Sequence, residues 1–156
     1  MHMPELKYPR PRVTVAAIVE REGRFLLVEE FDAAGKLVIN QPAGHVEAGE
    51  SLPQALVRET VEETGWQVEP TALVGAYLWA PPDKSISYLR IAIAAHGLSH
   101  DEQAPLDEGI VRAVWLSREE LAVRRQAHRS ELVLRCIDDY LAGESYPLSA
   151  LKAILP

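Results

Sequence analysis

The sequence predicts a mixed α/β fold of the α+β kind, in which a mixed central sheet lies between helical layers. Short runs rich in β-branched and apolar residues occur both before residue 50 and after residue 66. A well-signalled helix, Leu52–Thr64, separates the two groups of runs, and a second run with helical spacing, Ser130–Leu141, lies near the carboxyl end. Strands on both sides of a central helix predict a sandwich rather than a doubly wound parallel sheet.

Length and composition predict a single globular domain spanning residues 1–156. Of the 156 residues, 47% are hydrophobic and 25% are charged, which is ordinary globular composition. The length suits one domain, since domains most often have roughly 100–150 residues. Cys136 is the only cysteine, and its apolar helical surroundings predict a small buried residue rather than a nucleophile.

The charge balance limits the partners that the chain is expected to have. A net charge of −7 and a pI near 5.2 argue against a nucleic-acid polymer, whose partners usually carry a basic patch. A small anionic substrate stays open, because a bound divalent cation reverses the sign of an acidic site. No apolar run reaches membrane-spanning length and no signal peptide is recognised, so we expect no membrane partner and a cytoplasmic location.

The expected strands are apolar runs bounded by turn residues. Arg12–Glu20 and Arg24–Glu30 flank the turn Arg21-Glu22-Gly23, and we expect them to form a hairpin. Glu69-Pro70 is expected to break the strand-like region between Trp66 and Trp79. The remaining expected strands are Leu37–Ile39, Ser87–Ala95 and Ile110–Leu116, and a polar surface loop is expected at His100–Glu108.

The helix Leu52–Thr64 has both of its ends marked in the sequence. Ser51 is a suitable N-cap, Gln54 completes a capping box, and Gly65 occupies the position where a left-handed residue ends a helix. Further helical segments are expected at Ser117–Leu121, which opens with a second capping box, at Ser130–Leu141, and within the tail Pro147–Leu155.

Several carboxylates gather on this helix. At 100° per residue, Glu59, Glu62 and Glu63 share one face, and Glu50 can reach the same end through the preceding loop. Two unit charges 4 Å apart cost roughly 4 kcal/mol at an effective dielectric of about 20, a cost that a hard cation such as Mg²⁺ or Mn²⁺ removes. A solvated face with ion pairs would need more cations than Arg58 alone. The pattern therefore predicts a divalent-metal site for diphosphate chemistry.

The spacing of these residues also matches a known motif. Gly44, Glu50, Arg58-Glu59, Glu62-Glu63 and Gly65 resemble the Nudix box. The resemblance implies a Nudix-type αβα sandwich that hydrolyses a nucleoside diphosphate linked to another moiety. It further implies a small-molecule phosphoanhydride as partner, and the family offers both monomers and homodimers.

The resemblance assigns roles to the residues of the box. The implied metal ligands are Glu59, Glu62, Glu63 and the carbonyl near Gly44. Arg58 is expected to pair with Glu50 and so to hold the loop on the helix. A carboxylate must accept the proton of the attacking water, and Glu62 or Glu63 is favoured within the box. Because family members place this base differently, Glu108 in the later loop is the alternative.

Substrate contacts are expected from residues outside the box. Arg24, Lys84 and Arg90 could pair with phosphate oxygens, and Arg90 stands out because it lies within an apolar strand. For Lys84 a solvated surface role is also open. Tyr77 could stack on a base or pyrimidine ring, although its strand position among apolar neighbours favours packing in the core.

Short segments outside the box are similar to the NudJ-type bacterial Nudix phosphatases. They are NQPAGH at 40–45, APPDK at 80–84, LR at 89–90 and YPL at 146–148. This similarity implies hydrolysis of nucleoside tri- and diphosphates, and of hydroxymethylpyrimidine pyrophosphate, a thiamin precursor. The alternatives are an ADP-ribose or nucleotide-sugar pyrophosphatase and, from another class, a non-catalytic nucleotide-sensing Nudix module. Such modules typically lose box carboxylates, and all four are present here.

Overall fold

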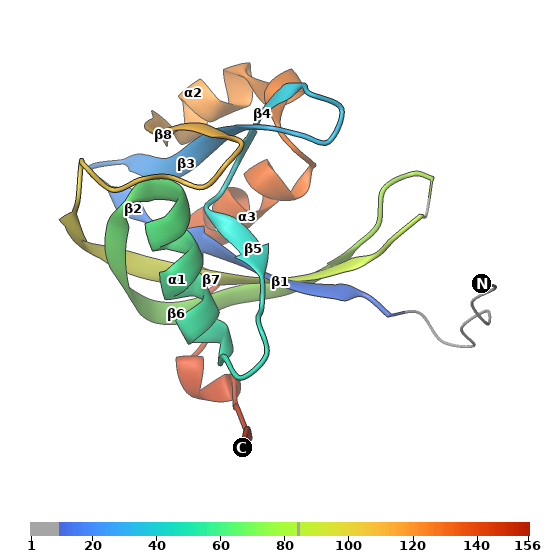
Figure 1. Ribbon diagram of the computed structural model, residues 1–156, viewed down its shortest axis with the longest axis vertical. Helices are drawn as coiled ribbons and strands as arrows, with labels where there is room; N and C mark the ends of the chain where they lie inside the picture. Colours follow the sequence, from blue (N-terminus) through green and yellow to red (C-terminus); the bar gives the residue numbers. More distant parts are fainter. Residues whose placement is uncertain (1–9, 84) are drawn as a thin grey trace.

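The fold is built around two four-stranded sheets (Figure 1). The structure is a computed structural model that describes residues 10–83 and 85–156. The strands of the first sheet, in spatial order, are β5 (Ala43–His45), β1 (Arg12–Ile18), β7 (Tyr88–His100) and β6 (Trp66–Trp79). Because β1 and β7 are parallel and the other neighbours are antiparallel, this sheet is mixed, as the sequence predicted.

The second sheet is antiparallel and centred on one strand. β3 (Arg24–Phe31) pairs with β2 (Glu20–Arg21), β4 (Leu37–Asn40) and β8 (Ile110–Ser117). The helices are α1 (Leu52–Thr64), α2 (Arg118–Val123) and α3 (Leu132–Leu141), and two short 3₁₀ helices, η1 (Arg125–Ala127) and η2 (Leu148–Ala150), complete the elements.

Helices α1 and α3 cover opposite faces of the first sheet. Successive residues of a strand point to opposite faces. Accordingly, Ile91 and Ile93 of β7 pack in one apolar cluster with Leu56 of α1. Ala92 packs in the other cluster with Ile137 of α3. This arrangement confirms the predicted αβα sandwich with a mixed central sheet.

The predicted hairpin between Arg12–Glu20 and Arg24–Glu30 forms only beside its turn, and the pairing predicted for the rest of the two runs is wrong. β1 and β3 lie in different sheets, and only the two-residue strand β2 pairs with the start of β3. Residues 15–19 are all buried, so β1 is an interior strand that needs a neighbour on each side. It finds them in β5 and β7, whereas the turn controls only the residues next to it.

The predicted break at Glu69-Pro70 is also wrong, because β6 runs without interruption through both residues. β6 lies at the edge of its sheet, where the missing N–H of proline is tolerated. The pairing of β6 with β7 shifts in register between Pro70 and Ala72, and this irregularity absorbs the proline. β7 in turn extends to His100, beyond the predicted strand end at Ala95.

The boundaries predicted for α1 are confirmed. The Ser51 side chain accepts a hydrogen bond from the Gln54 N–H at 3.2 Å, and the Gln54 side chain accepts one from the Ser51 N–H at 2.8 Å. Gly65 ends the helix with a φ of 76°. The capping box at Ser117 and the burial of Cys136 are confirmed as well. Within the described residues, no helix is long and apolar enough to cross a membrane.

Removing the cap of α1 gives a first prediction. Ser51→Ala deletes an acceptor for the first turn, which typically costs about 1 kcal/mol, so the melting temperature is expected to fall by roughly 2–4 °C. Thermal unfolding followed by circular dichroism measures the change. Ser145→Ala, an exchange of the same type at an exposed position, is the control. Equal melting temperatures for the two variants would contradict the capping role.

Candidate active site

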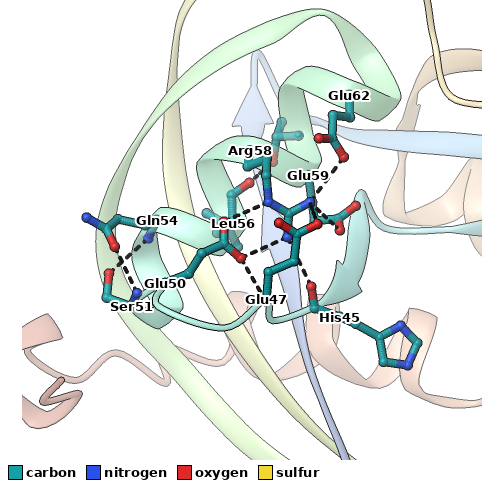
Figure 2. A network of polar contacts seen from close by, with 10 residues as sticks. His45, Glu47, Glu50, Ser51, Gln54, Leu56, Arg58, Glu59 and Glu62 are labelled. Carbon is teal, nitrogen blue, oxygen red and sulfur yellow. Dashed lines mark hydrogen bonds and ion pairs between the residues drawn. The ribbon is translucent and has the colours of Figure 1, made fainter. Parts of the chain in front are cut away.

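Arg58 is the centre of a hydrogen-bond network that ties the loop after β5 to α1 (Figure 2). Its Nε donates to Glu50 Oε2 at 2.6 Å, and its Nη2 donates to Glu50 Oε1 at 2.9 Å and to the His45 carbonyl at 3.0 Å. The hydrogen bonds from Arg58 hold the pKa of Glu50 below its usual range, so Glu50 is ionised at neutral pH. The Arg58–Glu50 contact that the resemblance implied is therefore present.

The same guanidinium reaches two further carboxylates. Arg58 Nη1 donates to Glu59 Oε1 at 2.9 Å and to Glu62 Oε2 at 3.1 Å. Burial raises the pKa of Glu59, and the hydrogen bond from Arg58 acts in the opposite direction. Arg58 thus holds two of the helix carboxylates in place as well as the loop.

Gly44 lies directly against the Glu59 carboxylate. A Cβ built on Gly44 would be 2.1 Å from Glu59 Cδ and 2.3 Å from Glu59 Oε1, so the Glu59 carboxylate could not keep this position beside a larger residue. The need for glycine at this position is therefore steric: only a residue without a side chain leaves room for Glu59.

Glu63 does not share the solvated side of the helix with Glu62. It is only 8% exposed, and its Oε1 accepts a hydrogen bond from the Ala43 N–H at 2.8 Å. Burial raises the pKa of Glu63 to about 9, and the nearby charges of Glu30, Glu59 and Asp107 add to the shift. A buried carboxylate of this kind is stabilised in its ionised form by a neighbouring cation.

Three carboxylates come together where the loop before β8 meets α1. Glu59, Glu62 and Asp107 each offer an oxygen, and these atoms all lie within 4.8 Å of one another. Hard divalent cations bind clustered carboxylate oxygens of this kind. The residues present therefore fit a divalent metal ion. The physical reason is that a bound cation would remove the repulsion among their negative charges.

Asp107 was missed by the sequence-based prediction, which chose its neighbour Glu108. The Asp107 N–H donates to the Glu62 carbonyl at 3.0 Å, and this bond attaches the β7–β8 loop to the end of α1. The local sequence offered two adjacent acids in one polar loop and no signal to separate them. Which of the two acids joins the group depends on how the loop packs on α1, and that packing is a tertiary contact.

The other predicted site residues lie apart from this acidic group. Glu108 is exposed and makes no side-chain hydrogen bond or ion pair with any residue in the described ranges. Arg24 is exposed and pairs with Glu120 of α2 at 3.6 Å. Tyr77 packs against the core and donates its hydroxyl to Asp139 at 2.7 Å. Lys84 lies outside the described residues. Their roles at a substrate remain predictions.

Arg90 occupies a different environment from the other predicted phosphate contacts. It is only 7% exposed, and its Nη1 and Nη2 donate to the side-chain oxygens of Gln41 and Asn40 at 2.9 and 3.0 Å. Its predicted contact with a phosphate therefore also remains a prediction.

Together, the αβα sandwich and the carboxylates gathered on a capped loop–helix unit define a hydrolase of phosphoric anhydrides. The chain belongs to the Nudix hydrolase family, since the sequence model of the NUDIX domain matches residues 9–136. That match confirms the family resemblance of the box.

Relatives and solved structures agree with this assignment. The chain is 40% identical to the protein named Phosphatase NudJ of Escherichia coli K12 over 142 residues, which cover 91% of each chain. It is similar to a NUDIX hydrolase from Nitrosomonas europaea, with a TM-score of 0.91, 44% identity, and coverage of 93% of this chain and 98% of the other. An ADP-ribose pyrophosphatase from Streptococcus suis shares the fold, with a TM-score of 0.56, 23% identity, and coverage of 78% and 95%.

Proposed function

We propose that this chain is a Mg²⁺-dependent phosphatase that hydrolyses the phosphoanhydride bonds of nucleoside tri- and diphosphates. Hydroxymethylpyrimidine pyrophosphate is a further expected substrate, and Mn²⁺ is expected to replace Mg²⁺. The observation that carries the proposal is the convergence of Glu59, Glu62 and Asp107 oxygens within 4.8 Å. The 40% identity to a protein named Phosphatase NudJ supports the substrate class.

The proposed metal ligands are the carboxylates of Glu59, Glu62 and Glu63 and the carbonyl near Gly44, to which we add Asp107. When bound, a divalent cation neutralises phosphate oxygens and lowers the pKa of a coordinated water. Arg58 keeps Glu59 and Glu62 in position through its hydrogen bonds, and Glu50 keeps Arg58 in position. Preorganisation of this kind avoids reorganising the site during the reaction.

The proposed proton acceptor is one of the carboxylates near the attacking water. Glu62 and Glu63 stay the candidates within the box. In the β7–β8 loop, Asp107 is now the stronger candidate, because it belongs to the convergent group and Glu108 does not. A base must lie within hydrogen-bond reach of the water that it deprotonates.

Exchanges of the two neighbouring loop acids test this assignment. Asp107→Asn is expected to lower the rate of phosphate release about a hundredfold, the size typical of losing a positioned acid–base group. Glu108→Gln, in the same loop and equally exposed, is expected to stay within about twofold of the unchanged protein. Steady-state phosphate release in Mg²⁺ measures both variants. If only Glu108→Gln lost phosphate release, Glu108 would be the proton acceptor of this loop and Asp107 would not.

A panel of substrates tests the proposed function itself. Release of hydrolysis products, separated by chromatography, would be measured with nucleoside tri- and diphosphates, hydroxymethylpyrimidine pyrophosphate, ADP-ribose and a nucleotide sugar, each with Mg²⁺ and with chelator, because cleavage of the last two gives two phosphate esters and no free phosphate. We expect metal-dependent release from the first three. Preference for ADP-ribose or the nucleotide sugar would instead support a pyrophosphatase, and the lack of any turnover would support a non-catalytic module.

A further inference from the structure

Arg90 on β7 is a buried cation whose hydrogen-bond partners are neutral. It forms no ion pair with an acid in residues 10–83 or 85–156, and both of its Nη atoms donate to side-chain amides. A buried charge is costly unless it is hydrogen-bonded. The acceptors Gln41 Oε1 and Asn40 Oδ1, at 2.9 and 3.0 Å, therefore have to keep their oxygens turned toward Arg90.

This requirement fixes the orientation of both amides. The Gln41 N–H also donates to Asn40 Oδ1 at 3.0 Å, so two donors meet the same atom and identify it as the oxygen. Gln41 uses its own amino group internally, donating from Nε2 to the Val133 carbonyl at 2.7 Å. The amino group of Asn40 therefore points away from Arg90 and, among the described residues, has no acceptor.

The amino group of Asn40 nevertheless reaches solvent. Asn40 is only 7% exposed. Yet in the part of the chain that the structure describes, no side-chain nitrogen or oxygen is completely shielded from solvent without a hydrogen-bond partner. Its Nδ2 must therefore open onto the surface. Asn40 thus presents an oriented donor that is free to bond water or a ligand, although the rest of the residue is buried.

Asn40 lies next to the acidic site. It ends β4 and stands three residues before Ala43, whose N–H holds Glu63. Figure 1 shows this segment passing directly from β4 into β5 beside α1. On the neighbouring strand, Glu30 lies two residues beyond Val28, the partner of Asn40 in the ladder.

The charges around Asn40 favour an anionic acceptor. Glu30 forms its ion pair with Arg129, whose Nη1 lies 2.7 Å from Glu30 Oε1. Arg90 has no such ion pair with an acid in the described residues. Burial lowers the pKa of Arg90, and Glu30 is among the groups that oppose this shift.

We propose that Asn40 is a specificity-determining residue that donates a hydrogen bond from Nδ2 to a phosphate oxygen outside the scissile bond. Arg90 is the positioning residue that holds the Asn40 amide in this orientation. This assignment rests on the proposed function, because it names a contact of the same active site with its phosphoanhydride substrate. It also gives Arg90 an indirect role at the phosphate.

The test compares two amide-to-carboxylate exchanges around one arginine. Asn40→Asp keeps the acceptor for Arg90 and deletes the donor. Gln41→Glu makes the same change of charge at the adjacent residue and keeps an acceptor for Arg90, but it replaces the internal hydrogen bond to the Val133 carbonyl by a repulsive contact between two oxygens. For a nucleoside triphosphate, Asn40→Asp is expected to raise KM at least about tenfold, the value of one hydrogen bond to a charged group, with kcat within about twofold. Gln41→Glu is expected to leave both constants within about twofold and to lower only the melting temperature.

Arg90→Lys tests the positioning role, because it keeps the charge and removes the two-pronged geometry. It is expected to raise KM with little change in kcat. The double variant Arg90→Lys with Asn40→Asp should raise KM no further than Asn40→Asp alone, because both changes remove the same contact. Additive effects would overturn the positioning role.

Calorimetric binding of inorganic tripolyphosphate in Mg²⁺ separates the possible failures. Asn40→Asp is expected to weaken this binding about tenfold, and Gln41→Glu is not. If Asn40→Asp raised the KM for the nucleotide but did not weaken tripolyphosphate binding, the phosphate assignment would be wrong. If Asn40→Asp and Gln41→Glu weakened tripolyphosphate binding equally, the added negative charge would explain the loss and the donor role would be wrong. If the unchanged protein bound tripolyphosphate but hydrolysed no nucleotide, the proposed function would fail while the subsite stood.

Discussion

Glu59→Gln is expected to reduce Mg²⁺-dependent phosphate release on the order of a thousandfold, the upper end for removing a preorganised electrostatic group. Glutamine has nearly the same shape and can still accept the 2.9 Å hydrogen bond from Arg58. It lacks the negative charge, so a group of three carboxylates becomes a group of two around the bound cation. The combined Glu59→Gln and Glu63→Gln variant is expected to lose metal-dependent release altogether.

Glu47→Gln is the matched control for this result. Glu47 also lies near Arg58, at 3.6 Å, but its side chain is 66% exposed and it is not part of the convergent group. The Glu47→Gln variant should release phosphate at a rate within about twofold of the unchanged protein, because exposed ion pairs contribute little. A Mg²⁺ titration of all variants gives both the rate and the apparent metal affinity. Wild-type release by Glu59→Gln would show the assignment of the metal site to be wrong.

Gly44→Ala is expected to lower phosphate release about a hundredfold while the domain stays folded. The new methyl group would lie 2.1 Å from Glu59 Cδ, so the carboxylate must leave its position beside Arg58. A misplacement of about 1 Å in a catalytic group can cost on the order of a hundredfold in rate. The Mg²⁺ concentration that gives half-maximal rate should rise in parallel. Release assays combined with thermal unfolding measure the effect.

Gly49→Ala separates this steric effect from backbone strain. Gly49 lies in the loop that follows β5 and has a φ of 84°, but a Cβ there would meet no atom within 4 Å. A left-handed alanine costs roughly 1–2 kcal/mol, so stability should fall while activity is largely retained. If Gly49→Ala lost as much activity as Gly44→Ala, strain in the loop would explain both results and the contact with Glu59 would not.

Sequence and structure agree wherever the determining interactions are local. The helix Leu52–Thr64 was predicted to the residue, because its cap, its first-turn proline and its terminal glycine all act within one turn. The contact between Arg58 and Glu50, which the resemblance to the Nudix box implied, is present. The family follows from the spacing of the box.

The failed predictions all involve partners that are distant in the sequence. The turn at Glu22-Gly23 gave no sign that β1 would pair with β7, 76 residues later, in place of its neighbour β3. The burial of Glu63 depends on the approach of Ala43 of β5, which helical periodicity does not describe.

The sequence by itself determined the family, the capped helix and the set of box carboxylates, because these depend on short-range spacing. Only the tertiary structure decided which carboxylates meet. It separated Asp107 from Glu108 by docking a loop on α1, and it joined Arg90 to Asn40 and Gln41 across the interior. Such contacts are set by which strands become neighbours in the two sheets, and that choice reflects burial of the whole core rather than any single segment.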